Sequence, residues 1–309
     1  MTDAVDLSVR VGSVSLANPI LTASGTAGYG AELGAYVDLA SLGAVVVKSL
    51  SPEPWAGNAA PRVHETPGGM LNSVGLHNGG VAAWLQHHLP ALRRAGARVV
   101  ASIWGFSVED YARAADLLAD AGPEVVAVEV NLSCPNLDGG RHLFAHSTAG
   151  TATVMAATAS CGRPRWAKLS PNVTDITEIA RAAIDSGAEA LTVVNTVMGL
   201  AIDPRAGTSR LGGGGGGLSG PAIHPVAVRA VYSCRAALPS VGIVGVGGVT
   251  DGAGALELLE AGADAVQVGT ATFANPRAPA LVLSEVRRWC AKTGTSRVAD
   301  LIGVAHARP

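Results

Sequence analysis

The stretch VVAVEVNLSCPN, residues 125–136, begins as an apolar run and ends in polar side chains. Its first six residues have the composition of a buried β-strand. The end of that strand then carries two amides, a hydroxyl and a thiol, from Asn131, Ser133, Cys134 and Asn136. The thiol could be a packed core group, a metal ligand, a redox centre or a catalytic group.

The same pattern of apolar run, loop and helical stretch recurs along the chain. Eight strand runs are predicted at 19–24, 44–49, 98–103, 125–133, 165–170, 190–196, 242–248 and 265–271. Helical stretches are clearest at 107–121, 175–186, 225–238 and 251–261. Strands that alternate with helices indicate a parallel sheet. Eight units with continuous apolar strands predict an α/β protein with a closed (β/α)₈ TIM barrel, rather than an open doubly wound sheet.

The ends of this barrel can also be anticipated. Two short strands, VDLSVRVG and SVSLANP, precede the first barrel strand and predict an N-terminal β-hairpin. The first connection, residues 25–43, is expected to be a loop and a helix. The helix at 175–186 is expected to start at Thr174 or Asp175 and to stop at Gly187. We expect a single barrel domain over residues 1–309, with no second domain.

Two connections are too long for simple turns. Residues 50–80 follow the second strand, and residues 197–224 follow the sixth and include six consecutive glycines. Long loops in a compact domain are usually binding loops or lids, here over the C-terminal rim. Because each glycine loses much backbone entropy on ordering, a tolerated linker expansion is the alternative interpretation of the glycine run.

Composition limits the class of protein. The chain has 309 residues, of which 48% are hydrophobic and 15% charged, and its formal charge is −2. These values are typical of a globular protein and give no basis for nucleic-acid binding. Neither a signal peptide nor a membrane span is recognisable, so a cytoplasmic location is expected.

Cysteine and histidine spacing argues against a metal site. Cys134, Cys161, Cys234 and Cys290 form no CxxC pair, and no HExxH motif is present. His142 and His146 are four residues apart but lack a third ligand nearby. Cys161, Cys234 and Cys290 fall in helical stretches and are interpreted as packing residues.

Lysine is scarce, and its positions are informative. The chain has only three lysines, and Lys48 and Lys168 each end an apolar strand run. A site that requires a compact ammonium is one interpretation. A stem packed in the core with its head in water is the other.

The C-terminal ends of barrel strands meet at one rim, where catalytic side chains usually gather. Here the rim would be a polar ring made by Ser24, Lys48, Ser49, Ser102, Asn131, Ser133, Cys134, Lys168, Ser170, Asn195, Thr196, Gly247, Gly248, Gly269 and Thr270. Glycine turns end the last two strands, and Gly220 would lie near them. Barrels often bind phosphate there, so a phosphate-bearing cofactor across the barrel mouth is predicted.

The chain resembles a known family over essentially its whole length. ASGTAGYG, VVVKSLSPEP, NSVGLHNGG, NLSCPN, AKLSPN, VVNT, GGLSGPAI, GVGGV and QVGTA are similar to segments of the class 1 dihydroorotate dehydrogenases, FMN-dependent barrels of pyrimidine synthesis. ASGTAGYG and GGLSGPAI look most like subclass 1B, whose members use NAD through a separate FAD and iron–sulfur subunit. Class 2 members carry a membrane segment and a serine base, and both are missing here.

The resemblance implies a role for each matched residue. Cys134 would be the base that takes the C5 proton of dihydroorotate, while the C6 hydride passes to N5 of FMN. Substrate contacts would come from Lys48, Asn72, Ser73, Val74, Gly75, Leu76, Asn131, Asn136, Asn195 and Thr196. FMN contacts would come from Ser24, Lys48, Ser49, Ser102, Asn131, Lys168, Val194, Gly220, Gly247, Gly248, Gly269 and Thr270.

Some features depart from the family pattern and leave alternatives. Ser102 stands where the family commonly has asparagine, and the glycine run replaces a more ordered stretch. The alternatives are a paralogue acting on another dihydropyrimidine or cyclic amide, a flavin-free barrel for a sugar phosphate, and a subunit that only relays electrons. The acceptor could be NAD through a partner subunit, or fumarate in a homodimer acting alone.

Overall fold

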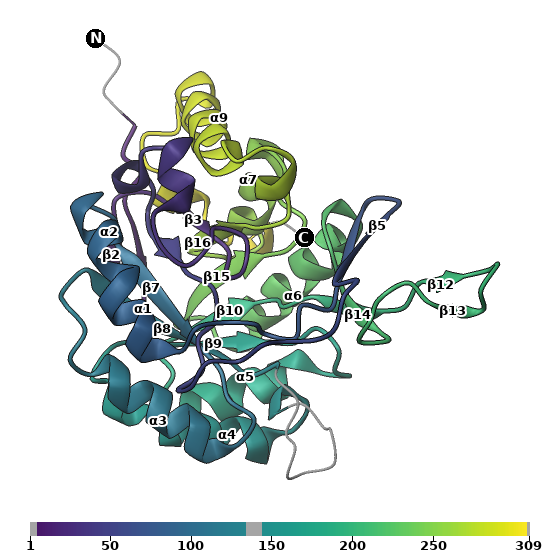
Figure 1. The fold of residues 1–309 in the computed structure, drawn as a ribbon. Helices are drawn as coiled ribbons and strands as arrows, with labels where there is room; N and C mark the ends of the chain where they lie inside the picture. The colour runs from purple at the N-terminus through teal and green to yellow at the C-terminus, as the bar shows by residue number, and fades with distance from the viewer. Residues whose placement is uncertain (1–4, 134–143, 308–309) are drawn as a thin grey trace.

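The chain forms a barrel of eight parallel strands surrounded by helices (Figure 1). The computed structural model describes residues 5–133 and 144–307. In sheet order the strands are β3 (Ile20–Thr22), β16 (Ala265–Val268), β15 (Gly242–Val246), β10 (Ala190–Val193), β9 (Arg165–Leu169), β8 (Val125–Asn131), β7 (Val99–Ile103) and β4 (Val45–Val46). Leu21 of β3 pairs in parallel with Ala44, beside β4, and closes the ring. The predicted barrel is confirmed, and the open sheet is excluded.

The four helices predicted most clearly are all present, with ends shifted by a few residues. They are α3 (Val108–Leu118), α5 (Ile176–Asp185), α6 (His224–Ala237) and α7 (Gly252–Glu260). Asp175 caps α5 by accepting the Thr177 N–H, as expected. Gly187 follows with a φ of 96°, a backbone conformation that favours glycine. Polar caps and glycine stops therefore mark the helix ends.

Further helices cover the rest of the barrel wall. They are α1 (Val81–His87), α2 (Leu89–Arg94), α4 (Thr148–Ala157), α8 (Ala271–Ala274) and α9 (Ala278–Thr293). Short 3₁₀ turns also occur, at η3 (Phe144–His146), η4 (Ala159–Cys161), η5 (Pro221–Ile223), η6 (Val298–Leu301) and η7 (Val304–His306). No helix of the described residues is long and apolar enough to cross a membrane.

The first connection differs from the prediction. Instead of an α-helix it contains two 3₁₀ turns, η1 (Glu32–Ala35) and η2 (Leu39–Ser41). Gly25 and Gly28 have φ values of 86° and 80°, and two more glycines follow before the end of η1. Glycine is a poor helix former, so this segment stays irregular along the barrel mouth.

The predicted N-terminal hairpin is present and closes the other end of the barrel. Strands β1 (Val9–Val11) and β2 (Val14–Leu16) pair antiparallel and alternate buried and exposed side chains. The N–H of Ser13, in the turn, donates to Glu189 Oε2 at 3.1 Å, just before β10 begins. The hairpin therefore lies under the N-terminal strand ends, and the opposite end stays open.

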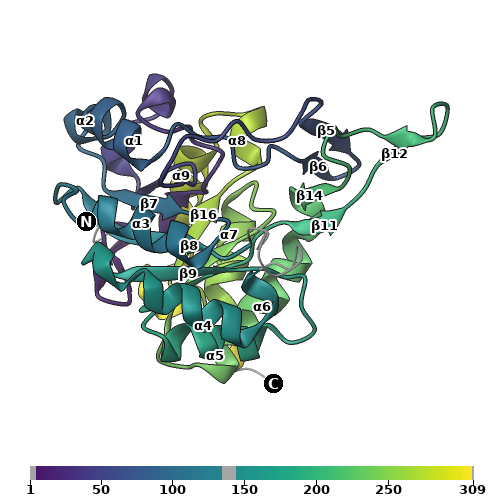
Figure 2. The same cartoon turned by 60° about the horizontal axis from the view of Figure 1, so that its bottom comes forward.

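The two long connections build a second sheet above the rim. Its order is β11 (Val197–Gly199), β14 (Gly216–Ser219), β6 (Gly69–Asn72) and β5 (Val63–Thr66), all antiparallel. A separate hairpin of β12 (Ile202–Asp203) and β13 (Thr208–Ser209) extends beyond it (Figure 2). Residues 50–80 and 197–224, distant in sequence, thus form one structure at the barrel mouth.

Candidate active site

The open end of the barrel holds a cavity of about 530 Å³. Side chains from the strand ends form its floor, and the second sheet forms one wall. Every described residue predicted for the site lines this cavity except Ser102 and Ser170, and the Ser170 hydroxyl accepts from Asn172 instead. Cys134 and Asn136 lie outside the described residues. The polar ring expected from the strand ends is therefore assembled in space.

Two asparagines and a serine are linked across the floor. Asn195 Nδ2 donates to Asn131 Oδ1 at 3.1 Å, and Asn131 Nδ2 lies 3.4 Å from Ser49 Oγ. Tyr111 Oη donates to the Asn131 carbonyl at 2.5 Å and fixes that strand end from behind. Because Asn131 is only 6% exposed, a ligand can contact little beyond its amide edge. The floor presents fixed amide groups to whatever enters.

Ser102 lies behind this floor. It is fully buried in β7, and its hydroxyl is 2.9 Å from Ser49 Oγ. Ser49 itself lines the cavity, so Ser102 reaches the site through that neighbour. The structure gives Ser102 a supporting position, in contrast to the direct cofactor contact expected from the sequence.

Residues 72–76 form a braced wall. Asn58 Nδ2 donates to Ser73 Oγ at 2.9 Å, and Trp55 Nε1 donates to the Gly75 carbonyl at 2.9 Å. On the other side, Asn72 Nδ2 donates to the Gly217 carbonyl at 3.2 Å. Leu76 has a φ of 64°, which is rare for a residue with a Cβ and bends the chain at the end of this segment. The wall is thus tied to both long connections.

The six-glycine run is ordered by close packing rather than acting as a linker. Strand β14 begins inside the run, at Gly216, and pairs with β6. A Cβ on Gly213 would lie 2.3 Å from Ser73 Oγ, and one on Gly217 would lie 2.0 Å from Thr196 Oγ1. A side chain at either position would therefore force Ser73 or Thr196 to move. The closest backbone approach is at Gly216, where a Cβ would lie 2.4 Å from the Asn72 carbonyl oxygen, so glycine is favoured where β14 meets β6.

Lys168 is the charged group of the floor. It is 4% exposed, and its Nζ donates to Ser24 Oγ at 3.1 Å and to Glu129 Oε1 at 3.3 Å. Asn131 lies beside it in the parallel register of β8 and β9. The ammonium is therefore fixed at the base of the cavity, next to the amide groups.

The far side of the cavity is built from glycines. Gly220 and Gly248 have φ values of 102° and 70°. A Cβ on Gly248 would lie 2.7 Å from His224 Cβ, and one on Gly247 would lie 2.7 Å from Ala227 Cβ. Thr270 Oγ1 donates to Ser219 Oγ at 2.8 Å beside them. These turns expose backbone where a phosphate would bind.

Ser133 is the last described residue of the NLSCPN motif. Its N–H donates to Asn131 Oδ1 at 3.3 Å, and the residue lines the cavity. Its buried Oγ has no hydrogen-bond partner within residues 5–133 and 144–307. A buried hydroxyl normally finds a partner, so this atom is an unsatisfied polar group beside the cavity.

The other cysteines are structural. Cys161, Cys234 and Cys290 are buried free thiols in η4, α6 and α9. Burial raises the pKa of the Cys234 thiol to about 12 and also raises the pKa of Cys161 and of Cys290. A raised pKa suppresses the reactive thiolate, so their predicted role as packing residues is consistent with their positions.

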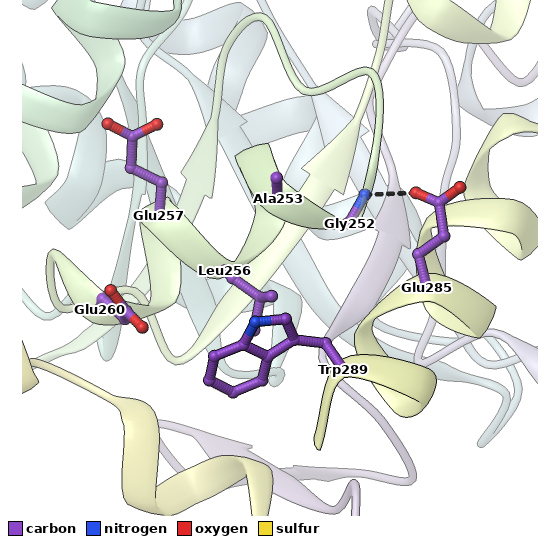
Figure 3. A pocket seen from close by; sticks show the side chains of 7 residues that line it. All are labelled: Gly252, Ala253, Leu256, Glu257, Glu260, Glu285 and Trp289. Carbon is purple, nitrogen blue, oxygen red and sulfur yellow. Dashed lines mark hydrogen bonds between the residues drawn. The ribbon is translucent and has the colours of Figure 1, made fainter. Parts of the chain in front are cut away.

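A second cavity, of about 390 Å³, lies outside the barrel between α7 and α9 (Figure 3). Its lining includes the carboxylates of Glu257, Glu260 and Glu285 and the ring of Trp289. Glu285 Oε2 accepts the Gly252 N–H at 2.6 Å. None of the predicted site residues lines it, and no group of three potential metal ligands converges anywhere in the described parts of the chain.

Sequence reasoning missed several residues of the rim site. Glu129 and Gln267 contact Lys168. Each could have been found in the sequence as a polar residue inside an apolar strand run. Asn172 braces Thr196 by donating to its carbonyl at 3.0 Å, and its signal lay in the motif AKLSPN. The signal of Ser219 lay in the motif GGLSGPAI, whereas Asn58 gave no signal because it reaches the site through a contact with Ser73.

Comparison with known proteins identifies the family. Residues 6–289 match the family model described as dihydroorotate dehydrogenase. The chain belongs to the dihydroorotate dehydrogenase family. A protein of Trichlorobacter lovleyi is 47% identical over 298 residues, 96% of this chain and 97% of that protein. A protein of Desulforudis audaxviator is 46% identical over 303 residues, 98% of both.

Both relatives are named dihydroorotate dehydrogenase B (NAD(+)), catalytic subunit, as is a protein of Geotalea daltonii that is 45% identical over 299 residues, 96% of this chain and 97% of that protein. The resemblance to subclass 1B inferred from the motifs is therefore confirmed. The motifs that carried it are the ones that line the barrel mouth.

The packing of the glycine run can be tested by Gly217→Ala. The added Cβ would overlap Thr196, so β14 should separate from β6 and expose both long connections. We expect trypsin to cleave after Arg62 or Arg210 at least about tenfold faster than in the wild type, because proteolysis follows the population of the open form.

Gly215→Ala is the matched control, since the nearest atom to its Cβ would be 3.3 Å away. It should be cleaved at close to the wild-type rate. Equal cleavage rates for all three proteins would contradict the close-packed wall.

Proposed function

We propose that this chain oxidises dihydroorotate to orotate in pyrimidine biosynthesis, with FMN bound across the barrel mouth. The observation that carries the proposal is a single cavity with a buried lysine and linked asparagines on one side and glycine turns on the other. The relatives' names support the substrate and the NAD-linked reaction.

The residues present fit FMN. Gly220, Gly247 and Gly248 line the cavity with backbone alone, because a Cβ on any of them would lie 2.7 Å from a neighbouring residue, and exposed backbone in a glycine turn suits a phosphate. Lys168 lies across the floor, where its ammonium would face the polar edge of a flat ring. Ser24, Ser49, Val194, Gly269 and Thr270 line the space between. A volume of about 530 Å³ is within the usual range for ligand sites.

The substrate would bind against the wall and floor beside the cofactor. Asn131 and Asn195 offer amides that can donate and accept, as a cyclic diamide with a carboxylate requires. Lys48, Thr196 and the segment 72–76 line the same space. Asn136 remains a predicted contact outside the described residues. Ser102 would contribute by orienting the Ser49 hydroxyl.

The chemistry divides between a bound cofactor and the protein. FMN, when bound, accepts the hydride that leaves C6 of dihydroorotate. We assign Cys134 to remove the C5 proton, so that the loss of a proton and a hydride leaves the C5–C6 double bond of orotate. A thiol has an ordinary pKa of about 8.5, close enough to working pH to act as a base.

The site geometry supports that assignment through the neighbours of Cys134. Ser133, the residue before it, lines the cavity, and its N–H is bonded to the Asn131 side chain. The base would therefore approach the ring that Asn131 and Asn195 hold. Lys168 would stabilise the negative charge that develops across the floor.

The proposal extends to assembly. We infer a single FMN-binding domain over residues 1–309, a homodimer, and a separate FAD and iron–sulfur subunit that passes electrons to NAD. The three described cysteines are buried apart from one another, and the chain has only four, too few in one place for a cluster. Free thiols also suit the reducing cytoplasm, where we place the protein.

The function is tested by colour. The purified protein should be yellow, release FMN on denaturation, and lose its flavin absorbance when dihydroorotate is added without oxygen. A colourless protein that contains no FMN would favour a flavin-free sugar-phosphate barrel. Bound FMN that dithionite reduces and no dihydropyrimidine does would point to an electron-relay subunit.

Cys134→Ala tests the base. The variant should retain FMN, because no FMN contact is removed, and should lose at least about a hundredfold in the rate of flavin reduction by dihydroorotate, since general-base catalysis contributes about 10²–10⁴. Stopped-flow absorbance gives this rate directly. Cys161→Ala, at a buried thiol of η4, is the control and should reduce at the wild-type rate. A fast Cys134→Ala variant would refute the assignment.

The electron acceptor is tested with the chain alone. Without a partner, the reduced protein should reoxidise slowly with NAD and also with fumarate, measured by return of flavin absorbance. Rapid reoxidation by fumarate would contradict the partner-dependent assignment. Copurification with a cysteine-rich flavoprotein that restores NAD reduction would support it.

A further inference from the structure

A buried carboxylate lies directly beneath the lysine of the proposed FMN site. Glu129 has no exposed surface and accepts hydrogen bonds from Gln267 Nε2 at 2.7 Å and from Lys168 Nζ at 3.3 Å. Gln267 is equally buried, and its Oε1 is 3.5 Å from the same ammonium. The three side chains form a closed triangle inside the barrel.

The parallel register places the triangle just below the cavity. Lys168 of β9 pairs with Asn131 of β8, and Glu129 precedes Asn131 by two residues on the same face of the strand. Lys168 and Asn131 line the cavity, whereas Glu129 and Gln267 do not. The carboxylate is therefore one layer deeper than the floor and can affect a ligand only through Lys168 or through its charge.

Stability alone is a weak reason for this arrangement. Removing a carboxylate and an ammonium from water is costly, and apolar side chains of similar volume are often as stable as a buried ion pair. Val128 and Val130 flank Glu129 along β8. The polar neighbours in register are uncharged side chains, namely Ser102 beside Glu129, and Asn131 and Thr192 beside Lys168. A charge kept in such surroundings suggests a function at the site above it.

We propose that Glu129 and Gln267 are positioning residues that hold the Lys168 ammonium at the floor and set the net charge beneath the flavin. This inference rests on the FMN site proposed above. Reduction adds negative charge to the flavin ring, which Lys168 stabilises and Glu129 opposes. The triangle has no net charge with both groups ionised, so it holds the flavin reduction potential below the value that an unpaired lysine would give.

The test is an exchange of charge between two neighbouring positions. Glu129→Gln removes the carboxylate and should favour the reduced flavin by about tenfold, a positive shift of about 30 mV for a two-electron couple. The double variant Glu129→Gln with Gln267→Glu moves the carboxylate to the other side of the same ammonium. In this double variant, the ratio of reduced to oxidised flavin at a given potential should return to within about threefold of the wild-type ratio.

The midpoint potential is measured by titration of the FMN-loaded proteins with dithionite at pH 7 against a reference dye. Glu260→Gln, a carboxylate change in the second cavity outside the barrel, is the matched control and should leave the potential unchanged. FMN content and thermal unfolding are recorded for each protein. If Glu129→Gln fails to hold FMN, the double variant alone decides the outcome.

The results separate this role from a structural one. A merely structural role predicts that two substitutions damage the site more than one, so a double variant that behaves like Glu129→Gln, or worse, would overturn the proposal. An unchanged or more negative potential in Glu129→Gln would do the same. Dihydroorotate takes no part in the titration, so the two proposals can fail separately. If the protein binds FMN and shows the predicted shifts but does not oxidise dihydroorotate, the proposed reaction is wrong and this inference stands. A wild-type protein without FMN would sink both.

Discussion

The closure of eight parallel strands is the constraint on which the rest of the structure depends. It brings together side chains that are far apart in sequence, such as Asn131, Lys168 and Asn195, at the floor of one cavity, where Asn131 and Lys168 are almost fully buried. Each polar group there must find a partner or bind a ligand. The hydrogen bonds among these residues are a consequence of that requirement, and so is the position of the cavity.

The second sheet gives the cavity at the barrel mouth its shape. Without it the strand ends would form an open floor. Strands β6 and β14 meet above that floor because Gly216 lets the Asn72 carbonyl approach closely. Gly213 and Gly217 leave room for the side chains of Ser73 and Thr196. Backbone hydrogen bonds between the strands offset the entropy lost on ordering so many glycines. The wall then serves as a rigid boundary rather than as a mobile lid.

The sequence predicted the barrel well because its strand runs are apolar, short and regularly interrupted. The helix ends were predictable wherever a local signal existed, as at Asp175 and Gly187. The helix expected between residues 25 and 43 was wrong, since its glycines favour an irregular path. The order of the six-glycine run could not be anticipated, because it depends on contacts with Ser73 and Thr196 across the cavity.

The site was predictable to the extent that its residues end strands. Lys168 was found this way, whereas its partners Glu129 and Gln267 lie within β8 and β16 and were passed over as parts of apolar runs. Ser102 was assigned to the cofactor through the family resemblance, at a position where the family commonly has asparagine, yet its side chain lies behind Ser49. Position along a strand predicts the depth of a side chain in the barrel only to within a residue or two. That difference decides whether the side chain contacts a ligand in the cavity or only supports a residue that does.

That difference of one layer has a chemical consequence. A charged group that touches a ligand contributes both contact and charge, whereas one a layer deeper contributes charge alone. Glu129 cannot hydrogen-bond a ligand in the cavity, so its negative charge opposes reduction without competing for space or donors. Lys168 provides the opposite charge at the surface of the floor. The barrel can therefore keep the contacts of its site fixed while adjusting the electrostatic potential from below.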